Sequence, residues 1–171
     1  VPTDVAIVKP IAKKASRAGI PLVIVNRLPD SDTMDNVDAY VGSESIQAGI
    51  IQAESIVGML DGKPGNVAIL MGVLGHEAQI NRTQGNKQVF DKHPNIKVVA
   101  EQEGRWDRAK ALQITEDWLQ ANPDIKGVIS GNDTMAMGAW AALEAAGRTD
   151  VVVVGFDGSN DVRVHRPTRP A

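Results

Sequence analysis

The sequence contains no cysteine, which excludes disulfides, a thiolate nucleophile and cysteine-ligated metal sites, and which suits an oxidising compartment. It has no apolar run near the roughly 18 residues that a membrane-spanning helix needs. Neither sign of charge dominates, because 18 basic and 21 acidic residues give a net charge of −3. That balance offers no electrostatic case for binding nucleic acid or an anionic membrane. The chain also begins without the basic start and apolar stretch of a signal peptide.

The usual signatures of catalysis and of nucleotide binding are missing too. His76, His93 and His165 are scattered along the chain and lack the spacing of metal ligands. The glycines of segment 72–75 do not complete a dinucleotide fingerprint, and there is no phosphate-binding loop. No serine nucleophile elbow or organised acid–base pair is visible. We therefore expect a protein that is not an enzyme and that uses no cofactor or metal.

What the chain does contain is a regular alternation of strand and helix patterns. Its 171 residues, 43% of them hydrophobic, suffice for one packed domain of ordinary size rather than two complete ones. Short apolar runs predict strands at 21–25, 39–42, 66–71, 96–101, 127–130 and 151–156. Helical periodicity predicts helices within 5–18, 46–60, 77–93, 107–121 and 134–146. This alternation is typical of an α/β fold with a parallel, Rossmann-like sheet and helices on both faces.

Two segments stand outside the alternation. The stretch 28–38 contains four aspartates and one proline, and we expect a surface loop that leads to a domain crossover near 41–44. The end of the chain, 163–171, has three arginines, two prolines and no periodicity, which predicts an irregular basic tail.

Polar residues follow three of the predicted strands. Asn26 and Arg27 come after the first strand, Asn132 after the strand at 127–130, and Asp157 after the last one. The carboxyl ends of strands are the ligand-binding edge of a parallel sheet. Carboxylate, amide and guanidinium groups can each make two hydrogen bonds, so this edge is predicted to bind a small, hydroxyl-rich molecule.

Several motifs together carry a resemblance to a known family. They are Gly-Asn-Asp-Thr-Met-Ala-Met-Gly-Ala at 131–139, Ala-Ala-Gly-Arg at 145–148 and Val-Val-Gly-Phe-Asp-Gly at 153–158. Pro-Thr-Asp at 2–4, Gly-Ile-Pro at 19–21 and the Asn26–Arg27 pair support them. Over residues 1–162 the chain resembles the periplasmic sugar-binding proteins of the ribose and galactose type, the solute receptors of ABC importers.

The resemblance implies a periplasmic binding protein of type I, with two Rossmann-like lobes that close on a sugar. It implies that residues 1–41 are the end of the N-terminal lobe and 42–162 most of the C-terminal lobe. The family's opening and closing segments have no counterpart here, so we expect the chain to be a fragment. The basic tail at 163–171 departs from the family pattern.

The same resemblance implies the binding residues. Asn26 and Arg27 match a polar pair that is often Asp-Arg in the family, so the sugar is expected to differ from ribose. Arg82 matches an arginine that reaches the ring oxygens, and Trp106 an aromatic residue that packs against the sugar.

Three further residues complete this implied set. Asn132 matches a side-chain amide, and Asp157 a carboxylate that accepts two hydroxyl protons, with Phe156 beside it. We expect Asn26, Arg82, Asn132 and Asp157 to gather around a common hollow.

Simpler interpretations stand beside these assignments. Asp157 before Gly158 could form only a turn. Asn132 and Asp133 could cap the following helix, with Asp133 capping and Asn132 binding if both roles hold. Arg82 could be a solvated helix charge. The residues Trp118, Trp140, Met135 and Met137 are expected in the core rather than at a ligand.

The function that this pattern favours is non-catalytic binding of a sugar or cyclic polyol, in the periplasm, for a membrane permease of an ABC importer. The alternative is the effector-binding domain of a lactose-repressor-type transcription regulator, which shares the fold and would carry a helix-turn-helix upstream. An α/β enzyme is a third class, disfavoured by the missing catalytic groups. Because half of the enclosing surface is expected to be missing, the chain alone is predicted to bind weakly and to self-associate.

Overall fold

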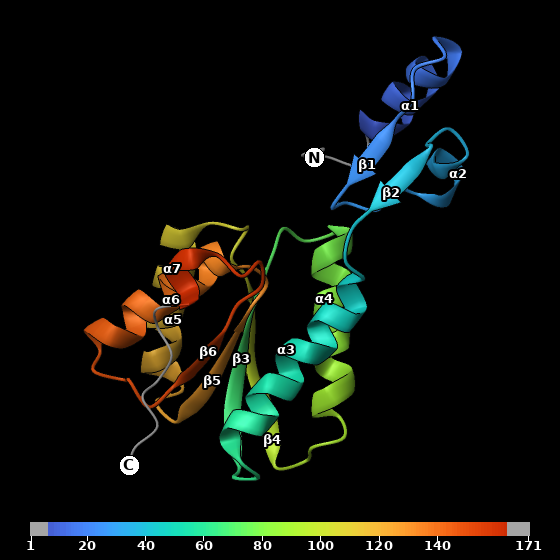
Figure 1. Ribbon diagram of the computed structural model, residues 1–171. Helices are drawn as coiled ribbons and strands as arrows, with labels where there is room; N and C mark the ends of the chain where they lie inside the picture. Colours follow the sequence, from blue (N-terminus) through green and yellow to red (C-terminus); the bar gives the residue numbers. More distant parts are fainter. Residues whose placement is uncertain (1–6, 164–171) are drawn as a thin grey trace. The chain divides into compact units, whose positions relative to one another are not determined.

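The computed structural model describes residues 7–163, and the chain divides into two compact units between Glu44 and Ser45. We call residues 1–44 unit 1 and residues 45–171 unit 2, and describe each by itself (Figure 1). The assignment of the two units to the lobes of a larger protein stays a prediction.

Unit 1 contains a helix, a strand, a short helix and a second strand. Their bounds are α1 (Val8–Arg17), β1 (Val23–Val25), α2 (Ser31–Met34) and β2 (Ala39–Val41). The two strands pair in parallel, with Val23 opposite Ala39. Gly19 follows α1 at a φ of 64°, the left-handed conformation in which glycine commonly ends a helix.

The prediction that 28–38 is only a loop was wrong, because α2 lies inside it. The hydroxyl and carboxylate residues Ser31 and Asp32 favour a helix start, and Thr33 is buried in the unit. The Asp38 carboxylate accepts a hydrogen bond from the Leu22 amide at 2.7 Å and so joins the end of this segment to β1.

Unit 2 is built on a parallel sheet in the order β4-β3-β5-β6 (Figure 1). The strands are β3 (Gly65–Met71), β4 (Ile96–Glu103), β5 (Ile125–Ser130) and β6 (Val152–Val154). The helices are α3 (Ser45–Leu60), α4 (Glu77–Phe90), α5 (Arg108–Ala121), α6 (Asp133–Ala145) and α7 (Asn160–Arg163). All the strands of this sheet run parallel and alternate with helices along the chain, which agrees with the predicted α/β fold.

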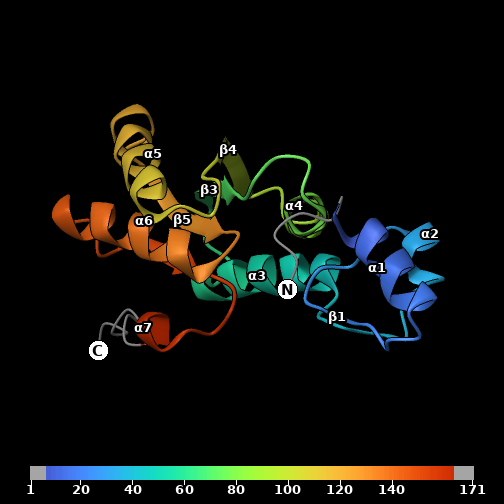
Figure 2. The ribbon, with the colours of Figure 1, turned by 90° about the horizontal axis from the view of Figure 1, so that it is seen from above.

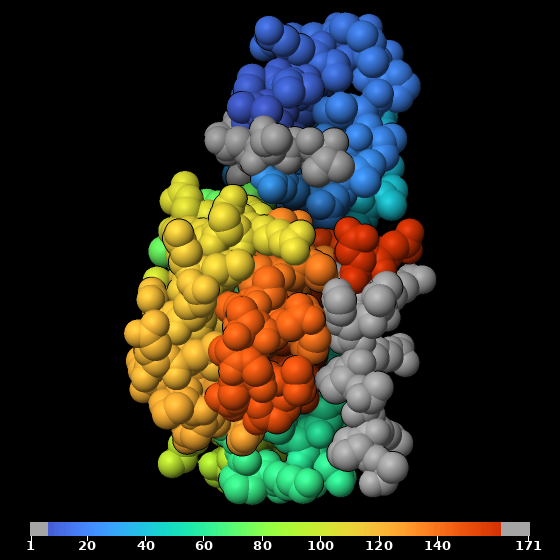
Figure 3. Space-filling model, turned by 90° about the vertical axis from the view of Figure 1, so that its left-hand side faces the viewer, coloured from blue at the N-terminus to red at the C-terminus, as the bar shows by residue number. Residues whose placement is uncertain are grey.

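Helices cover both faces of this sheet, as the sequence predicts, with α3 and α4 on one face and α5 and α6 on the other (Figure 2). The alternation of side chains along each strand separates the two cores. Val67 of β3 packs with α3 and α4, whereas Ala68 and Leu70 pack with α5 and α6. Figure 3 looks onto the outer surface of α5 and α6. Trp118 and Met135 are buried in the core on that side, as predicted.

Glycines allow α3 and α4 to touch through their backbones. A Cβ atom at Gly49 would lie 2.1 Å from the carbonyl oxygen of Arg82, and one at Gly85 would lie 2.2 Å from that of Ile46. The Asn86 amide donates a hydrogen bond to the Gly49 carbonyl across the same contact, at 2.8 Å. This close packing determines where α4, and with it Arg82, lies against the sheet.

Some predicted boundaries were too long. The α4 helix ends at Phe90 rather than near His93, because the next residues turn with i→i−3 hydrogen bonds. The last strand ends at Val154 and not at Phe156, since Gly155 leaves the sheet to pass close to α6. Arg163 ends α7, whereas the rest of the predicted tail lies outside the described residues. Within the described residues, no helix has the length and apolar character to cross a membrane.

Candidate functional site

The candidate site lies at the carboxyl edge of the unit 2 sheet. The chain runs from β3 to β4 on one side and then crosses to β5 on the other, so β3 and β5 flank a switch in strand order. Ligands of open α/β sheets bind at such switch points, beyond the carboxyl ends of the strands. Five of the residues predicted to bind a ligand belong to unit 2, and all five lie near this edge: Arg82, Trp106, Asn132, Phe156 and Asp157.

Arg82 links α4 to the loops after β5 and β6. Its Nη1 donates a hydrogen bond to the Gly131 carbonyl at 2.6 Å, and its guanidinium carbon lies 3.7 Å from the centre of the Phe156 ring. The side chain is buried, with 8% of the residue exposed, so it is not a solvated helix charge. Burial lowers the pKa of Arg82, while the charges of Asp157 and Glu77 raise it.

The buried guanidinium keeps unused hydrogen-bonding capacity. Its Nε is enclosed and has no hydrogen-bond partner among the described residues. Within these residues no carboxylate forms a salt bridge with Arg82, although Asp157 and Glu77 act on it at longer range. Buried charges in proteins are normally paired, so this arginine is suited to a partner outside the protein.

Asp157 is held in an unusual backbone conformation just after β6. Its φ is 129°, a region in which only glycine is comfortable, and its side chain is exposed. Strained residues of this kind cluster at functional sites. Although Asp157 is exposed as a residue, partial burial of its carboxyl raises the pKa of Asp157; the hydrogen bond from the Asp133 amide lowers it, the Asp133 charge raises it, and the Arg82 charge lowers it.

Asn132 is the cap of α6, which corrects the expectation that Asp133 would cap and Asn132 would only bind. The Asn132 Oδ1 accepts a hydrogen bond from the Met135 amide at 2.9 Å. Asp133 is the first helical residue and accepts instead from the Ser159 amide at 2.7 Å. The roles exchange because Asn132 has the extended backbone of a cap residue. The Asn132 Nδ2 makes no hydrogen bond to another described residue.

Trp106 covers the point where the strand order switches. Its ring lies against Gly72, after β3, and Gly131, after β5, where Cβ atoms would fall 1.9 and 2.9 Å from it. The residue is half-buried, packs against the core below and has a φ of 62°. Its ring and that of His76 form a T-shaped contact, with the ring centroids 5.9 Å apart. Trp106 thus combines packing with an aromatic surface at the site.

Sequence reasoning missed Gln52, which braces the strand ends from α3. Its amide nitrogen donates to the carbonyls of Ser130 at 2.8 Å and Gly155 at 3.0 Å. The sequence signal that could have identified it is a polar residue at a position on the apolar face of α3, and the structure shows that only 3% of Gln52 is exposed.

Asn26 and Arg27 lie in unit 1, directly after β1. Asn26 is exposed and has a φ of 74°, and its amide donates to the Val41 carbonyl at 2.8 Å. Asparagine tolerates this left-handed conformation better than most residues do. The expectation that Asn26 joins Arg82, Asn132 and Asp157 around one hollow stays a prediction.

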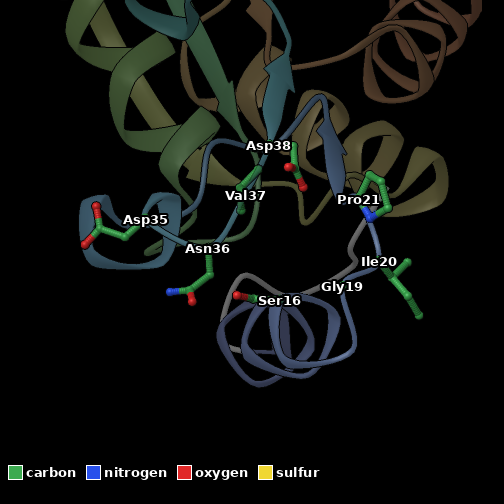
Figure 4. Close-up of a pocket in the computed structure, with 8 residues that line it drawn as sticks. All are labelled: Ser16, Gly19, Ile20, Pro21, Asp35, Asn36, Val37 and Asp38. Atoms are coloured by element: carbon green, nitrogen blue, oxygen red, sulfur yellow. The ribbon is translucent and has the colours of Figure 1, made fainter.

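A pocket in unit 1 contains none of the predicted binding residues. Figure 4 shows it between the end of α1 and the segment after α2. Its lining residues are Ser16, Gly19, Ile20, Pro21, Asp35, Asn36, Val37 and Asp38. In the part of the chain that the structure describes, no three histidine, cysteine or acidic residues are grouped as a metal site.

Comparison with known proteins shows which family the chain resembles. The sequence model of a family described as periplasmic binding protein domain matches residues 1–164. The chain is 44% identical to the D-apiose import binding protein of Paraburkholderia graminis, over 88% of this chain and 47% of that protein. It is 39% identical to the D-allose-binding periplasmic protein of Escherichia coli K12, over 94% of this chain and 53% of that protein.

Solved structures show the same similarity. An ABC transporter solute-binding protein of Bacillus halodurans with bound myo-inositol superposes with a TM-score of 0.84 and 42% identity. That comparison covers 94% of this chain and 55% of the other. The resemblance inferred from the sequence motifs and the predicted fold class are thereby confirmed. The chain spans about half the length of the curated relatives it matches.

Proposed function

This chain belongs to the periplasmic binding protein domain family, and on that premise we propose that the protein binds a neutral sugar or cyclic polyol without altering it chemically. The observation that carries the proposal is the buried Arg82, which has no salt-bridge partner among the described residues and stacks on Phe156 near the strained Asp157. This arrangement costs stability unless a ligand makes use of it.

The groups at this edge are complementary to a row of hydroxyls. The Arg82 guanidinium and the Asn132 Nδ2 are donors, and the Asp157 carboxylate is an acceptor whose hydrogen bond from the Asp133 amide is long, at 3.5 Å. A hydroxyl can accept a hydrogen bond from the donors and donate one to the carboxylate. The aromatic rings of Phe156 and Trp106 offer flat apolar surfaces for the C–H face of a sugar ring.

The charges at the site favour a neutral ligand over a sugar acid. One cation, Arg82, interacts with the Asp157 and Glu77 carboxylates, and the Asp133 carboxylate interacts with Asp157. An added carboxylate on the ligand would meet a site that is already negative overall. Asn26 and Arg27 of unit 1 are proposed as further contacts on the strength of the family motif.

The proposed setting is the periplasm, where the loaded protein delivers its ligand to the permease of an ABC importer. The named relatives are import or solute-binding proteins, which supports a receptor over the effector domain of a transcription regulator. The proposal involves no turnover. Recovery of the bound sugar unchanged after long incubation with the protein, measured by NMR, is the expected result.

Isothermal titration calorimetry of the complete protein tests the binding. The probes are D-apiose, D-allose, D-ribose and myo-inositol, with D-glucuronate as a charged comparison. At least one neutral compound is expected to bind and D-glucuronate to bind more weakly. Absence of binding by all four neutral compounds would refute the proposal.

The apolar strands of unit 1 bear on the predicted self-association of the 171-residue chain. Val23, Val25 and Val41 leave 53%, 45% and 59% of their surface exposed within this chain. Exposed strands with apolar side chains are templates for pairing with another chain. Sedimentation of the isolated chain is expected to show dimers or larger species at about 100 μM, a concentration at which such contacts form. A monomer at that concentration would contradict the prediction.

A further inference from the structure

Asp133 joins the start of α6 to the loop that carries Asp157. Its Oδ2 accepts a hydrogen bond from the Ser159 amide at 2.7 Å, and its own amide donates to the Phe156 carbonyl at 2.8 Å. These bonds lie on either side of Asp157 in the sequence. Only 4% of Asp133 is exposed whereas Ser159 is exposed, so the hydrogen bond between them is part-buried.

The loop passes this carboxylate at a distance that only glycine permits. A Cβ atom at Gly155 would lie 2.2 Å from the Asp133 Oδ1. The loop is therefore held against Asp133 two residues before Asp157, the residue with the φ of 129°. A backbone in such a conformation persists only where surrounding contacts impose it, and Asp133 supplies contacts on both sides.

The charge of Asp133 acts on Asp157 as well. As the first residue of α6, Asp133 is itself stabilised by the positive end of the helix. The charged groups that influence Asp157 are Asp133 from α6 and Arg82 from α4. The first disfavours an ionised Asp157, and the second favours it.

We propose that Asp133 is a positioning residue for the sugar or polyol: it anchors the loop 155–159 so that the Asp157 carboxylate is presented to the ligand, and it does not contact the ligand itself. This inference rests on the proposed function. The competing explanation is that Asp133 only stabilises the first turn of α6.

The test uses Asp133→Ala and Asp133→Asn in the complete protein, with Asp117→Asn, at an exposed position of α5, as the matched control. The probes are D-allose and myo-inositol. The alanine variant loses the acceptor for the Ser159 amide and is expected to bind about tenfold more weakly or worse, since an unmade buried hydrogen bond has that effect. The asparagine variant keeps an acceptor and is expected to retain affinity within about threefold at neutral pH.

Two readouts separate positioning from helix stability. Amide hydrogen exchange of Ser159 in the ligand-free protein is expected to accelerate in Asp133→Ala, because the loop is released. The pH at which binding weakens in acid is expected to fall in Asp133→Asn, because a like charge near Asp157 is gone, and to stay unchanged in Asp117→Asn.

The outcomes are distinguishable from failure of the proposed function. If the unmodified protein binds no neutral compound, the proposed function fails, and the inference with it. If it binds one, unchanged affinity or unchanged Ser159 exchange in Asp133→Ala overturns the inference alone. If the alanine variant does not fold, the asparagine variant decides: the inference is overturned if the pH at which binding weakens in acid is the same in Asp133→Asn as in the unmodified protein.

Discussion

Replacing Asp157 by glycine is predicted to make the protein more stable and its binding weaker. At a φ of 129° an aspartate is strained, whereas glycine is not. The same change removes the carboxylate that is proposed to accept from the ligand. Asp157→Ala is the matched variant, because it removes the carboxylate but keeps a Cβ atom and hence the strain.

The magnitude follows from two opposing terms. A residue held in such a conformation costs about 1–3 kcal/mol, and the greater freedom of glycine in the unfolded chain takes back about 0.5–1 kcal/mol. The hydrogen bond lost to the Asp133 amide is long, at 3.5 Å, and contributes little. The net gain in unfolding free energy for Asp157→Gly over Asp157→Ala is therefore about 1 kcal/mol, or roughly 2–4 °C in the melting temperature.

The loss of binding is larger than this gain. Hydrogen bonds to a charged acceptor contribute about 1.5–3 kcal/mol, so either variant is expected to lose at least about 2 kcal/mol, a rise in Kd of roughly 30-fold. Calorimetry with the neutral sugar panel measures it in the complete protein.

Urea unfolding followed by tryptophan fluorescence measures the stability term. All three tryptophans of the chain lie in unit 2, so in the 171-residue chain the signal reports that unit alone. Equal stability of the glycine and alanine variants would show that the backbone at this position is not strained. An unchanged Kd in both variants would remove Asp157 from the site.

Three other predictions concern the framework of unit 2 and are checked by urea unfolding. Gly49→Ala forces a Cβ atom into the backbone of α4 and should lower the unfolding free energy by about 1–3 kcal/mol. Gly58→Ala, on the same helix with open space around it, should raise the unfolding free energy by about 0.5–1 kcal/mol. Equal effects of the two changes would contradict the close helix contact. Gln52→Leu leaves two strand-end carbonyls without their donor and should cost about 2 kcal/mol, and an unchanged unfolding midpoint would rule out the brace. Two basic partners lower the pKa of Asp150 from 3.8, so its stabilisation is present above that pH and is lost as the pH falls below it. Because Asp150 is exposed, Asp150→Asn should cost no more than about 1 kcal/mol at neutral pH, and the difference from the unmodified protein should shrink in strong acid.

Much of the architecture could be predicted because strands and helices depend on the pattern of apolar residues within short segments. Val67, Ala68 and Leu70 alternate along β3 in a short apolar run, and the helices repeat their buried residues every three to four positions. Errors arose where a local pattern had two outcomes. Ser31 and Asp32 suit a loop as well as a helix start, and Asn132 and Asp133 are both competent caps.

The sequence by itself determined the parallel α/β arrangement, the family, and the strand ends at which polar residues collect, because each of these depends on neighbours within a few positions. Only the tertiary structure decided that Arg82 bonds to Gly131, 49 residues away, and that Gln52 reaches Gly155, 103 residues away. It also decided the left-handed backbone of Asp157 and the contact of Asp133 with the loop around it. Such features follow from the strand order and from the close approach of helices to the sheet, which bring distant residues within hydrogen-bonding distance and which no local pattern encodes.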